Sequence, residues 1–530
     1  MLHITRKAFY EYNKMKEENN MKKFLAIVLA MLMVLSVCTA CSKSGGDNGE
    51  ITLTWYVPGD KYPDTALVVE ELNKITMEKI GCKIDLQFID TGSFQERMNM
   101  NMASNSDYDL TFVGYLNQFE PAASKGGLMQ LDELLKLAPG ITETIPEYIR
   151  NSGVYMGKTY AIPNMQITAY ALAATTPKEY ADAFKKATGK DVTTFTNSLQ
   201  YEDYMEFVKA NYPGVYPMRT SYGMGSFRSQ DEGWDAKDPF FRTPLNGGSF
   251  YQLYKDSENK KFKVINGFKE EELTHARMRA DKLHEYFKKG WIRQDIDSVL
   301  DEEAELKQKK YALWYGTYKP GMDGEASNRY GWETVSTRIS SVSIGSASAT
   351  MVGIGANCKH PEEAIKFIEL MNTDKEAYNL VCFGIEGKHY NKVGDERIEL
   401  VEGSGYNPNA SWKFGNQFNA YRLPGQPDDV WEQTIEFNNL GYEMSKVNPD
   451  VTTLGFTFNQ EDIKSTVTKV SEIDNKYMAK KHGSKDPATY WDQMLAEADA
   501  AGNQIIIDEY QKQLDAFFEE HPEKLAEIVW

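Results

Sequence analysis

Two of the five cysteines, Cys38 and Cys41, lie three positions apart at the end of an apolar run. This spacing could hold a metal ion, form a redox pair or place one cysteine for covalent attachment. A zinc site needs a second set of Cys or His ligands, and a redox pair of this kind needs a βαβ context. The sequence around Cys38 and Cys41 has neither, so we expect no metal and no cofactor there.

Other catalytic patterns fail on their spacing. The segment "GVYMGKT" resembles a phosphate loop, but Gly153 and Gly157 are one residue too close, and the following "YAIP" favours a strand rather than a helix. The HExxH and GxSxG motifs are absent, and His275 and His284 are nine residues apart in a segment with a helical pattern. These patterns therefore predict no nucleotide site, metalloprotease or serine hydrolase.

Carboxylates are abundant, with 77 Asp and Glu against 59 Lys and Arg, a net charge of −18. Asp60, Asp90 and Glu386 lie in loops that we expect near a binding site. A glycosidase needs two such groups facing each other across a sugar. The simpler role is to accept hydrogen bonds from ligand hydroxyls, and a glycoside hydrolase remains an alternative. The acidic surface argues against nucleic acid or anionic lipid as a partner.

Aromatic side chains make up 12% of the chain, with 31 Tyr and 9 Trp. Tyr and Trp combine a large apolar face with a polar group, which suits stacking on sugar rings or peptide groups in a wet site. For any single ring, packing in the core or on the surface is the competing explanation.

The elements that would position these residues begin at Ile51. The segment "ITLTWYVPGD" predicts a strand with Ile51, Leu53 and Trp55 on one face. A helix follows, with Asp64 as its cap and Gly81 at its end. Further strands "KIDLQFID" and "YDLTFVG" complete βαβ units, so we expect a largely parallel sheet. Ligands bind at the carboxyl ends of such strands, which in this chain are residues 55–60, 90–93 and 114–117.

The length of 530 residues predicts at least two packed bodies. We assign residues 50–165 and 311–345 to the first, because "KKYALWYG" has the pattern of a strand returning to it. Residues 166–310 and 346–530 form the second, with an aromatic, Gly-rich insert from Tyr212 to Tyr254 and a C-terminal helical region.

The N-terminal segment "MKKFLAIVLAMLMVLSVCTAC" has a basic pair followed by 14 apolar or small residues, Phe24 to Val37. This is the pattern of a secretory signal, and it makes Met21 the expected start and residues 1–40 a segment that is removed. The residues "CTA" before Cys41 resemble the bacterial lipobox, although Cys38 stands where Leu is usual. We expect Cys41 to carry a lipid, with residues 41–50 as a flexible tether.

Segments spread over most of residues 50–530 resemble the extracellular solute-binding proteins of bacterial ABC importers, the maltose-binding-like class. The resemblance is closest to the lipoproteins of that class with an extra C-terminal region of unknown function. It is carried by "LTFVGYLNQFEPAASKGGLMQLDELL", "YMGKTYAIPN", "ALWYG", "KHPEEAIKFIELMNTDKEAYNLVCFGIEGKHY", "FGNQF" and "LGFTFNQ".

This resemblance implies a two-lobed α/β clam whose chain crosses between lobes more than once and closes by a hinge. It implies a monomeric receptor outside the cell membrane that captures a small solute, with an oligosaccharide as the expected ligand, and delivers it to a permease. A receptor that presents its ligand to a membrane sensor would leave the same sequence pattern, so that alternative stays open.

The candidate ligand-binding residues are mainly aromatic and polar side chains in segments that we expect near the crevice. Trp55 is equally suited to the core, Asn164 equally suited to a turn, and packing is the simpler role for the insert. At most one of Trp314 and Tyr315 can reach a ligand, since they point to opposite faces. We expect Trp412 and Phe418 to pack between elements. The candidates are Trp55, Tyr56, Asp60, Tyr115, Asn164, Tyr222, Trp234, Trp314, Tyr315 and Glu386.

Overall fold

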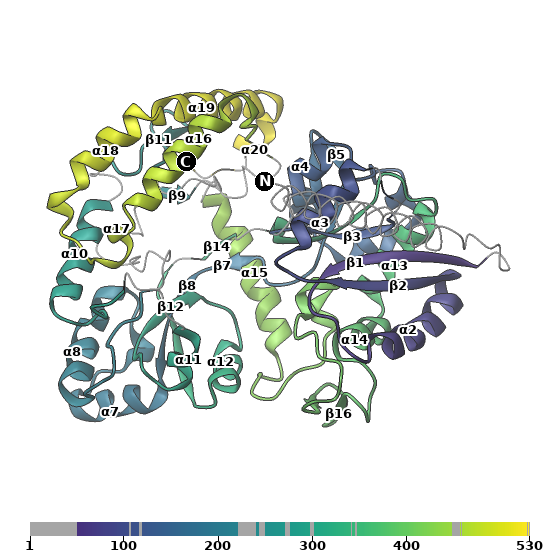
Figure 1. The fold of residues 1–530 in the computed structure, drawn as a ribbon, viewed down its shortest axis with the longest axis horizontal. Coiled ribbons are helices and arrows are strands. Elements are labelled where there is room, and N and C mark those ends of the chain that lie inside the picture. The colour runs from purple at the N-terminus through teal and green to yellow at the C-terminus, as the bar shows by residue number, and fades with distance from the viewer. Residues whose placement is uncertain are drawn as a thin grey trace, which may run out of the picture. The chain divides into compact units, whose positions relative to one another are not determined.

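The computed structural model describes much of the chain from residue 50 onward, and the elements below belong to the unit Thr52–Trp530, with β1 starting one residue earlier (Figure 1). Three residues with predicted roles, Cys41, Tyr222 and Trp234, lie outside the described residues, so these roles remain predictions. The described residues are 50–104, 106, 108–115, 119–220, 240–242, 250–270, 276–296, 302–340, 342–344, 347–447, 456, 458–526, 528 and 530.

The first sheet is mixed, with the strand order β2-β1-β3-β15-β6. Strand β1 runs parallel to β3, whereas β15 is antiparallel to both β3 and β6. Alternation in β1 buries Leu53 and Trp55, as the sequence pattern predicts, and also Val57, whereas Ile51 on the same face is half-buried. The strands are β1 (Ile51–Pro58), β2 (Cys82–Ile89), β3 (Leu110–Gly114), β6 (Ala161–Pro163) and β15 (Thr350–Ile354).

Helix α2 (Thr65–Ile80) packs on β2 and ends at Gly81, whose φ of 72° is a left-handed conformation that glycine adopts without strain. Asp64 occupies the cap position, as predicted, but its side chain makes no bond to the helix. It pairs instead with Lys388 and His389. Helices α13 (Pro361–Thr373) and α14 (Lys375–Phe383) also pack against α2, so "HPEEAIKF" and the following helix belong to the first body.

The second sheet has the order β12-β8-β13, and both pairings are antiparallel. The prediction that residues 311–345 return to the first body is therefore wrong for strands β12 and β13. The prediction that residues from 346 onward belong to the second body is wrong for β15, because this strand pairs with β3 and β6 in the first sheet. Helices from the middle of the chain share a core with this sheet. These elements are β8 (Leu172–Pro177), β12 (Trp314–Thr317), β13 (Thr334–Arg338), α7 (Lys178–Thr188), α8 (Glu202–Asn211) and α10 (Ala276–Lys288).

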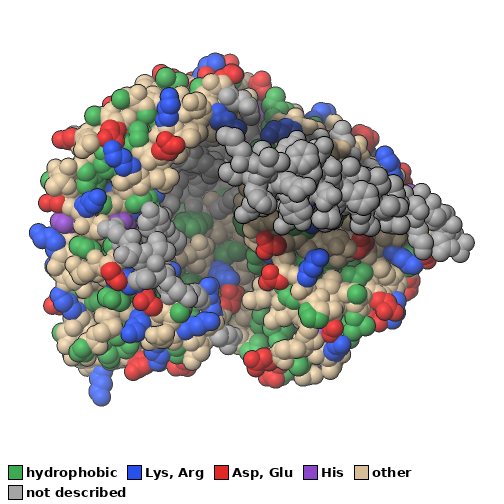
Figure 2. Space-filling model, viewed as in Figure 1, with side chains coloured by type: hydrophobic (Ala, Val, Ile, Leu, Met, Phe, Trp, Pro, Cys, Tyr) green, Lys and Arg blue, Asp and Glu red, His purple; other side chains and the backbone are tan. Residues whose placement is uncertain are grey.

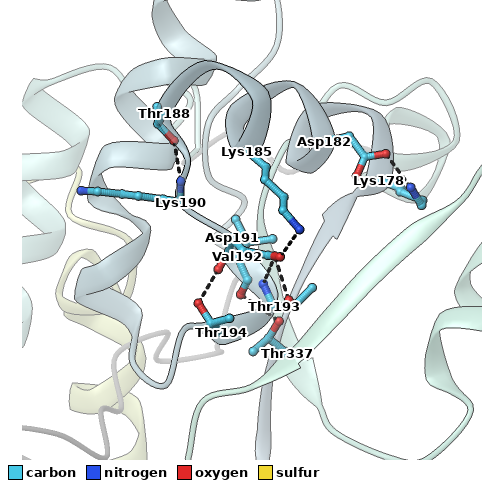
Figure 3. Close-up of polar contacts among 10 residues, drawn as sticks. All are labelled: Lys178, Asp182, Lys185, Thr188, Lys190, Asp191, Val192, Thr193, Thr194 and Thr337. Atoms are coloured by element: carbon cyan, nitrogen blue, oxygen red, sulfur yellow. Dashed lines mark hydrogen bonds and ion pairs between the residues drawn. The ribbon is translucent and has the colours of Figure 1, made fainter.

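A short turn after α7 fixes the edge of this core (Figure 3). The Asp191 carboxylate accepts hydrogen bonds from the backbone N–H and the hydroxyl of Thr193, at 3.0 and 2.7 Å, and pairs with Lys185 at 2.6 Å. The carbonyl of Val192 accepts a bond from the Thr337 hydroxyl at 3.0 Å. The turn is thereby tied both to helix α7 and to strand β13.

The chain passes between the two bodies at residues 164–170. Strand β7 (Ala169–Tyr170) pairs with β14 (Ser343–Ile344), and both pack against helix α15 (Val430–Val447). The buried amide of Asn438 on α15 accepts bonds from the N–H groups of Thr168 and Ala169, at 2.8 and 3.0 Å. It also donates to the carbonyl of Gln166 at 2.8 Å. One side chain therefore holds three backbone groups of this crossing.

The C-terminal helices share a core with a third sheet, which is antiparallel and has the order β11-β10-β9. Gln511 on α19 accepts a bond from the Val264 N–H at 2.7 Å and donates to the carbonyl of Phe262 at 3.1 Å. Both bonds lie on β11, an edge strand. These elements are β9 (Phe240–Arg242), β10 (Gln252–Asp256), β11 (Lys261–Ile265), α16 (Lys464–Lys476), α17 (Ala479–His482), α18 (Trp491–Ala500), α19 (Asn503–Glu520) and α20 (Pro522–Ala526).

Shorter helices and hairpins complete the fold. Within the described ranges, no helix combines the length and the apolar composition that crossing a membrane would require. The remaining elements are α3 (Phe94–Ala103), α4 (Phe119–Ser124), α5 (Pro139–Thr144), α6 (Glu147–Arg150), α11 (Glu302–Lys307), α12 (Met322–Tyr330), β4 (Val154–Tyr155), β5 (Lys158–Thr159), β16 (Tyr390–Lys392) and β17 (Ile398–Leu400).

Candidate ligand-binding site

Tyr115, which is exposed, and Trp412, which is half-buried, form an aromatic pair at the end of strand β3. Tyr115 follows the last residue of the strand, and 53% of its surface is exposed. Its ring centroid lies 6.0 Å from that of Trp412, with an angle of 50° between the rings. We refer to Tyr115 and Trp412 as the aromatic platform. An exposed tyrosine of this size beside a half-buried tryptophan offers stacking surface without any movement of the core.

The platform rests on a cluster of buried rings beneath it. Phe112, on β3, meets the Tyr115 ring edge to face at 5.7 Å, and Phe94 packs on Phe112 from α3. Tyr56, on β1, is half-buried and packs with Trp412 against the same cluster. The platform therefore has rigid support from two parallel strands and a helix.

Charged groups flank the platform on the side of β1. Lys413 donates a hydrogen bond to the carbonyl of Pro58 at 2.9 Å, and its ammonium lies 4.9 Å from the centre of the Trp412 ring. Burial lowers the pKa of Lys413, and the negative charge of Asp60 partly opposes this change. Asp60 itself is exposed, just beyond the end of β1.

This arrangement suits a neutral ligand that is rich in hydroxyl groups. The rings can stack on the apolar face of a sugar, while Lys413 provides a hydrogen-bond donor and Asp60 an acceptor. The platform lies at the carboxyl ends of β1 and β3, where ligands of open α/β sheets bind. Among the described residues, no group of three or more His, Cys, Asp or Glu side chains is placed to hold a metal ion.

Three of the predicted ligand-binding aromatics have packing roles in this structure. Trp55 is buried between Phe367 and Phe414, with ring centroids 5.2 and 5.8 Å away. Trp314 and Tyr315 do point to opposite faces, but both are buried. Trp314 packs in a separate cluster around the end of α12, and Tyr315 lies in the core of the second sheet. Strand alternation predicts which face of its strand each ring lies on. It does not predict whether other elements of the protein cover that face.

Asn164 and Glu386 are placed differently from each other. Asn164 is 2% exposed, and its amide donates to the carbonyl of Trp412 at 3.3 Å. It therefore contacts the backbone of the platform rather than its rings. Glu386 is exposed and forms an ion pair with Lys392 at 3.1 Å. Tyr115, Asn164 and Tyr56 thus lie close to Trp412 or on the same ring cluster, and Asp60 lies close enough to influence Lys413.

Trp412 and Lys413 are the site residues that sequence reasoning does not find. The sequence pattern predicts packing for Trp412 and assigns no role to Lys413. The one signal for both is their position directly before "FGNQF", the most specific part of the resemblance together with "GIEGKHY". The cysteines Cys82, Cys358 and Cys382 are buried free thiols.

Comparison with known proteins adds a family model and several relatives. Residues 452–519 match a domain of unknown function, DUF3502. A carbohydrate ABC transporter substrate-binding protein of Streptococcus pneumoniae serotype 4 is 25% identical over 516 residues, which cover 94% of this chain and 99% of the relative.

Solved structures agree with this result. The N-glycan transport solute-binding protein NgtS of Streptococcus pneumoniae superposes with a TM-score of 0.75 at 21% identity, covering 89% of this chain and 99% of that one. An extracellular solute-binding protein of Bifidobacterium longum subsp. infantis gives a TM-score of 0.63 at 16% identity, with the same coverage. These likenesses establish the two-lobed α/β fold that the sequence predicts.

The matched domain of unknown function coincides with the helical C-terminal region that the resemblance implies. The full-length relative covers the sheets and the crossing between the two bodies. Over almost its whole length the chain is thus similar to a carbohydrate ABC transporter substrate-binding protein, and it shares the fold of the solved solute-binding proteins.

Proposed function

We propose that this protein captures an oligosaccharide outside the cell and delivers it to the permease of an ABC importer. The observation that carries the proposal is the aromatic platform at the carboxyl ends of β1 and β3, flanked by Lys413 and Asp60. The names of its relatives support the ligand class, since NgtS has been crystallised with Man1GlcNAc and with Man5GlcNAc.

The binding energy would come from a small number of stacked rings and hydrogen bonds. A micromolar Kd corresponds to about −8 kcal/mol. Truncating one central aromatic anchor of a binding site costs about 2 kcal/mol or more, which is about 30-fold in affinity. Trp412 is the best candidate for such an anchor, because it contacts Tyr115 and Lys413 and packs with Tyr56 on the same ring cluster. Moderate affinity suits a receptor that must release its cargo.

Closure follows from the same energetics. A ligand that contacts both lobes binds the closed state more tightly than the open one and shifts the population toward it. The crossing at residues 164–170, held by Asn438, is a candidate hinge element. In this proposal the protein releases its ligand unmodified. Asp60 would serve as a hydrogen-bond acceptor rather than as one of a catalytic pair.

We also propose that a lipid on Cys41 anchors the protein to the outer face of the cell membrane. The mature chain would then begin with the tether that precedes β1. Replacement of Cys41 by Ala should release the protein from washed membranes into the soluble fraction. Continued association of Cys41→Ala with membranes after washing without detergent would refute the anchor.

A thermal-shift screen of oligosaccharides and peptides, with recovery of the ligand, tests the binding role. An oligosaccharide should raise the Tm and be recovered unchanged. Trp412→Ala should reduce the shift at a given ligand concentration, whereas Trp530→Ala, which truncates a half-buried tryptophan in the C-terminal region, should retain it. Stabilisation by peptides alone, or hydrolysis of the sugar, would overturn the proposal.

An uptake assay separates an importer from a receptor for a membrane sensor. Cells that lack the protein should lose uptake of the radiolabelled oligosaccharide identified in the screen, and the wild-type gene should restore it. Normal uptake together with a lost transcriptional response to the sugar would instead support the sensor.

A further inference from the structure

The Trp412 side chain stands on a three-residue turn that is fixed by its neighbours. The turn is the short helix Ser411–Lys413, which has too few residues to hold its own conformation. Tyr378 donates to the carbonyl of Ser411 at 2.6 Å, and Gln417 donates to the Ser411 hydroxyl at 2.9 Å. These two bonds fix the start of the turn.

The other end of the turn is held by two residues from the first sheet. Asn164 donates to the carbonyl of Trp412 at 3.3 Å, and Lys413 donates to the carbonyl of Pro58 at 2.9 Å. Asn164 directly follows β6, and Pro58 is the last residue of β1. The backbone of Trp412 is thus connected to two strands of the sheet at whose edge its ring lies.

Asn164 is itself fixed before it reaches Trp412. Its N–H donates to the carbonyl of Thr350 at 2.9 Å, and the next residue, Met165, accepts a bond from the Gln417 N–H at 2.7 Å. With 2% of its surface exposed, the Asn164 side chain has no access to a ligand. Its effect on binding must therefore pass through the Trp412 turn.

We propose that Asn164 and Lys413 are positioning residues that hold the Trp412 ring in the orientation that stacks on a ligand. The proposal rests on the proposed function for the role of the ring, but the geometry that it describes belongs to the free protein. A binding surface fixed before the ligand arrives avoids the entropy cost of ordering it during binding. This explains why an asparagine with almost no exposed surface lies among the residues of the site.

The positioning is tested first in the absence of ligand. Protein labelled with 5-fluorotryptophan should give one ¹⁹F resonance for each of its nine tryptophans, and Trp412→Phe identifies the relevant one. Asn164→Ala and Lys413→Met should shift or broaden the Trp412 resonance and leave the resonances of Trp491 and Trp530, in the C-terminal core, unchanged. Lys413→Arg retains a donor for the Pro58 carbonyl and should preserve the wild-type resonance.

Affinity for Man5GlcNAc, measured by calorimetry, gives the second readout. Each of Asn164→Ala and Lys413→Met should weaken binding about tenfold, the value of one hydrogen bond. An unchanged Trp412 resonance in both variants would overturn the inference, as would a change of all nine resonances, which indicates a general loss of structure.

The two proposals fail in different ways. If wild-type protein and Trp412→Ala bind Man5GlcNAc equally well, the aromatic platform is not the binding site, and the proposed function loses its main support. If Trp412→Ala loses binding but Asn164→Ala and Lys413→Met retain both affinity and the wild-type resonance, only the positioning role is refuted. If the wild type does not bind Man5GlcNAc, the ¹⁹F spectra of the free protein decide the positioning role.

Discussion

Replacing Asn438 by Leu should destabilise the protein more than any surface substitution on the same helix. Asn438 is 2% exposed and makes three hydrogen bonds of 2.8 to 3.0 Å to the crossing segment. Leucine fills a similar volume but leaves the N–H groups of Thr168 and Ala169 and the carbonyl of Gln166 without this partner. Thr168 and Ala169 are both buried, so water does not readily replace the lost bonds.

The magnitude follows from the number of groups left unpaired. Each buried donor or acceptor without a partner costs about 1 to 3 kcal/mol, and relaxation of the backbone recovers part of this. We expect a total of about 3 to 5 kcal/mol, against the roughly 5 to 15 kcal/mol that is typical of domain stability. Asn438→Asp retains the acceptor for both N–H groups but buries a charge and places a carboxylate oxygen against the carbonyl of Gln166, so it should also lower the free energy of unfolding by several kcal/mol.

Urea denaturation followed by circular dichroism measures these differences, with the m value checked for each variant. Asn439→Leu is the matched control, since this neighbour on α15 is exposed and should change stability by about 0.5 kcal/mol or less. If Asn438→Leu and Asn439→Leu unfold at the same urea concentration, the bonds to the crossing do not contribute to stability, and Asn438 does not hold this segment in place.

Two further substitutions test local geometry. The hydrogen bonds from Lys185 and Thr193 lower the pKa of Asp191 to about 2, so its ionised form stabilises the fold above its usual pKa of 3.8, and this contribution is lost as the pH falls from 3.8 toward 2. Asp191→Asn should therefore lower the free energy of unfolding by about 1 kcal/mol at pH 7, after allowance for solvent screening, and by less at about pH 3. Urea denaturation at the two pH values measures this, and equal losses at both would contradict the assignment. Gly415 has a φ of 130°, and a β-carbon there would lie 2.4 Å from the carbonyl of Met371. Gly415→Ala should lower the Tm and weaken sugar binding. An unchanged melting curve would show that the backbone around Gly415 can move away from Met371 without cost.

The local elements of the first body could be predicted because their signals are short-range. Alternation of Leu53, Trp55 and Val57 specifies β1, and Gly81 ends α2 where its left-handed conformation is needed. A local sequence pattern does not show when a distant residue binds a side chain that could otherwise cap a helix. Asp64 has the right position to cap α2, but Lys388 and His389, which bind its carboxylate instead, are distant in the sequence, with His389 at a separation of 325 residues.

Strand pairing and exposure could not be predicted from pattern alone. The segment "ALWYG" is as suitable for one sheet as for the other, and its pairing with β8 depends on contacts with residues from Leu172 to Thr175, far earlier in the chain. The candidate site shows the same limit. Tyr115 could be found because it directly follows a strand, whereas Trp412 reaches the platform from a turn that has no periodic pattern.

Figure 2 shows acidic and basic side chains interspersed over the face in view, with isolated apolar side chains between them. Interspersed charges of both signs, with no extended apolar area, are the pattern that disfavours association between protein surfaces. Among the described residues of this face, no broad region of one charge is visible. The site is identified by ring geometry rather than by electrostatic potential.

The bonds from Gln511 to β11 bear on aggregation. An uncovered edge strand offers its free N–H and C=O groups to any passing chain and can seed intermolecular sheets. The Gln511 amide occupies one such N–H and one such C=O with a side chain that cannot propagate a sheet. Gln511 is translated 247 residues after Val264. In a growing or truncated chain, the N–H of Val264 and the carbonyl of Phe262 therefore lack this partner. Where Gln511 is bonded, this part of the edge is closed to pairing with another strand, whether or not a ligand is bound.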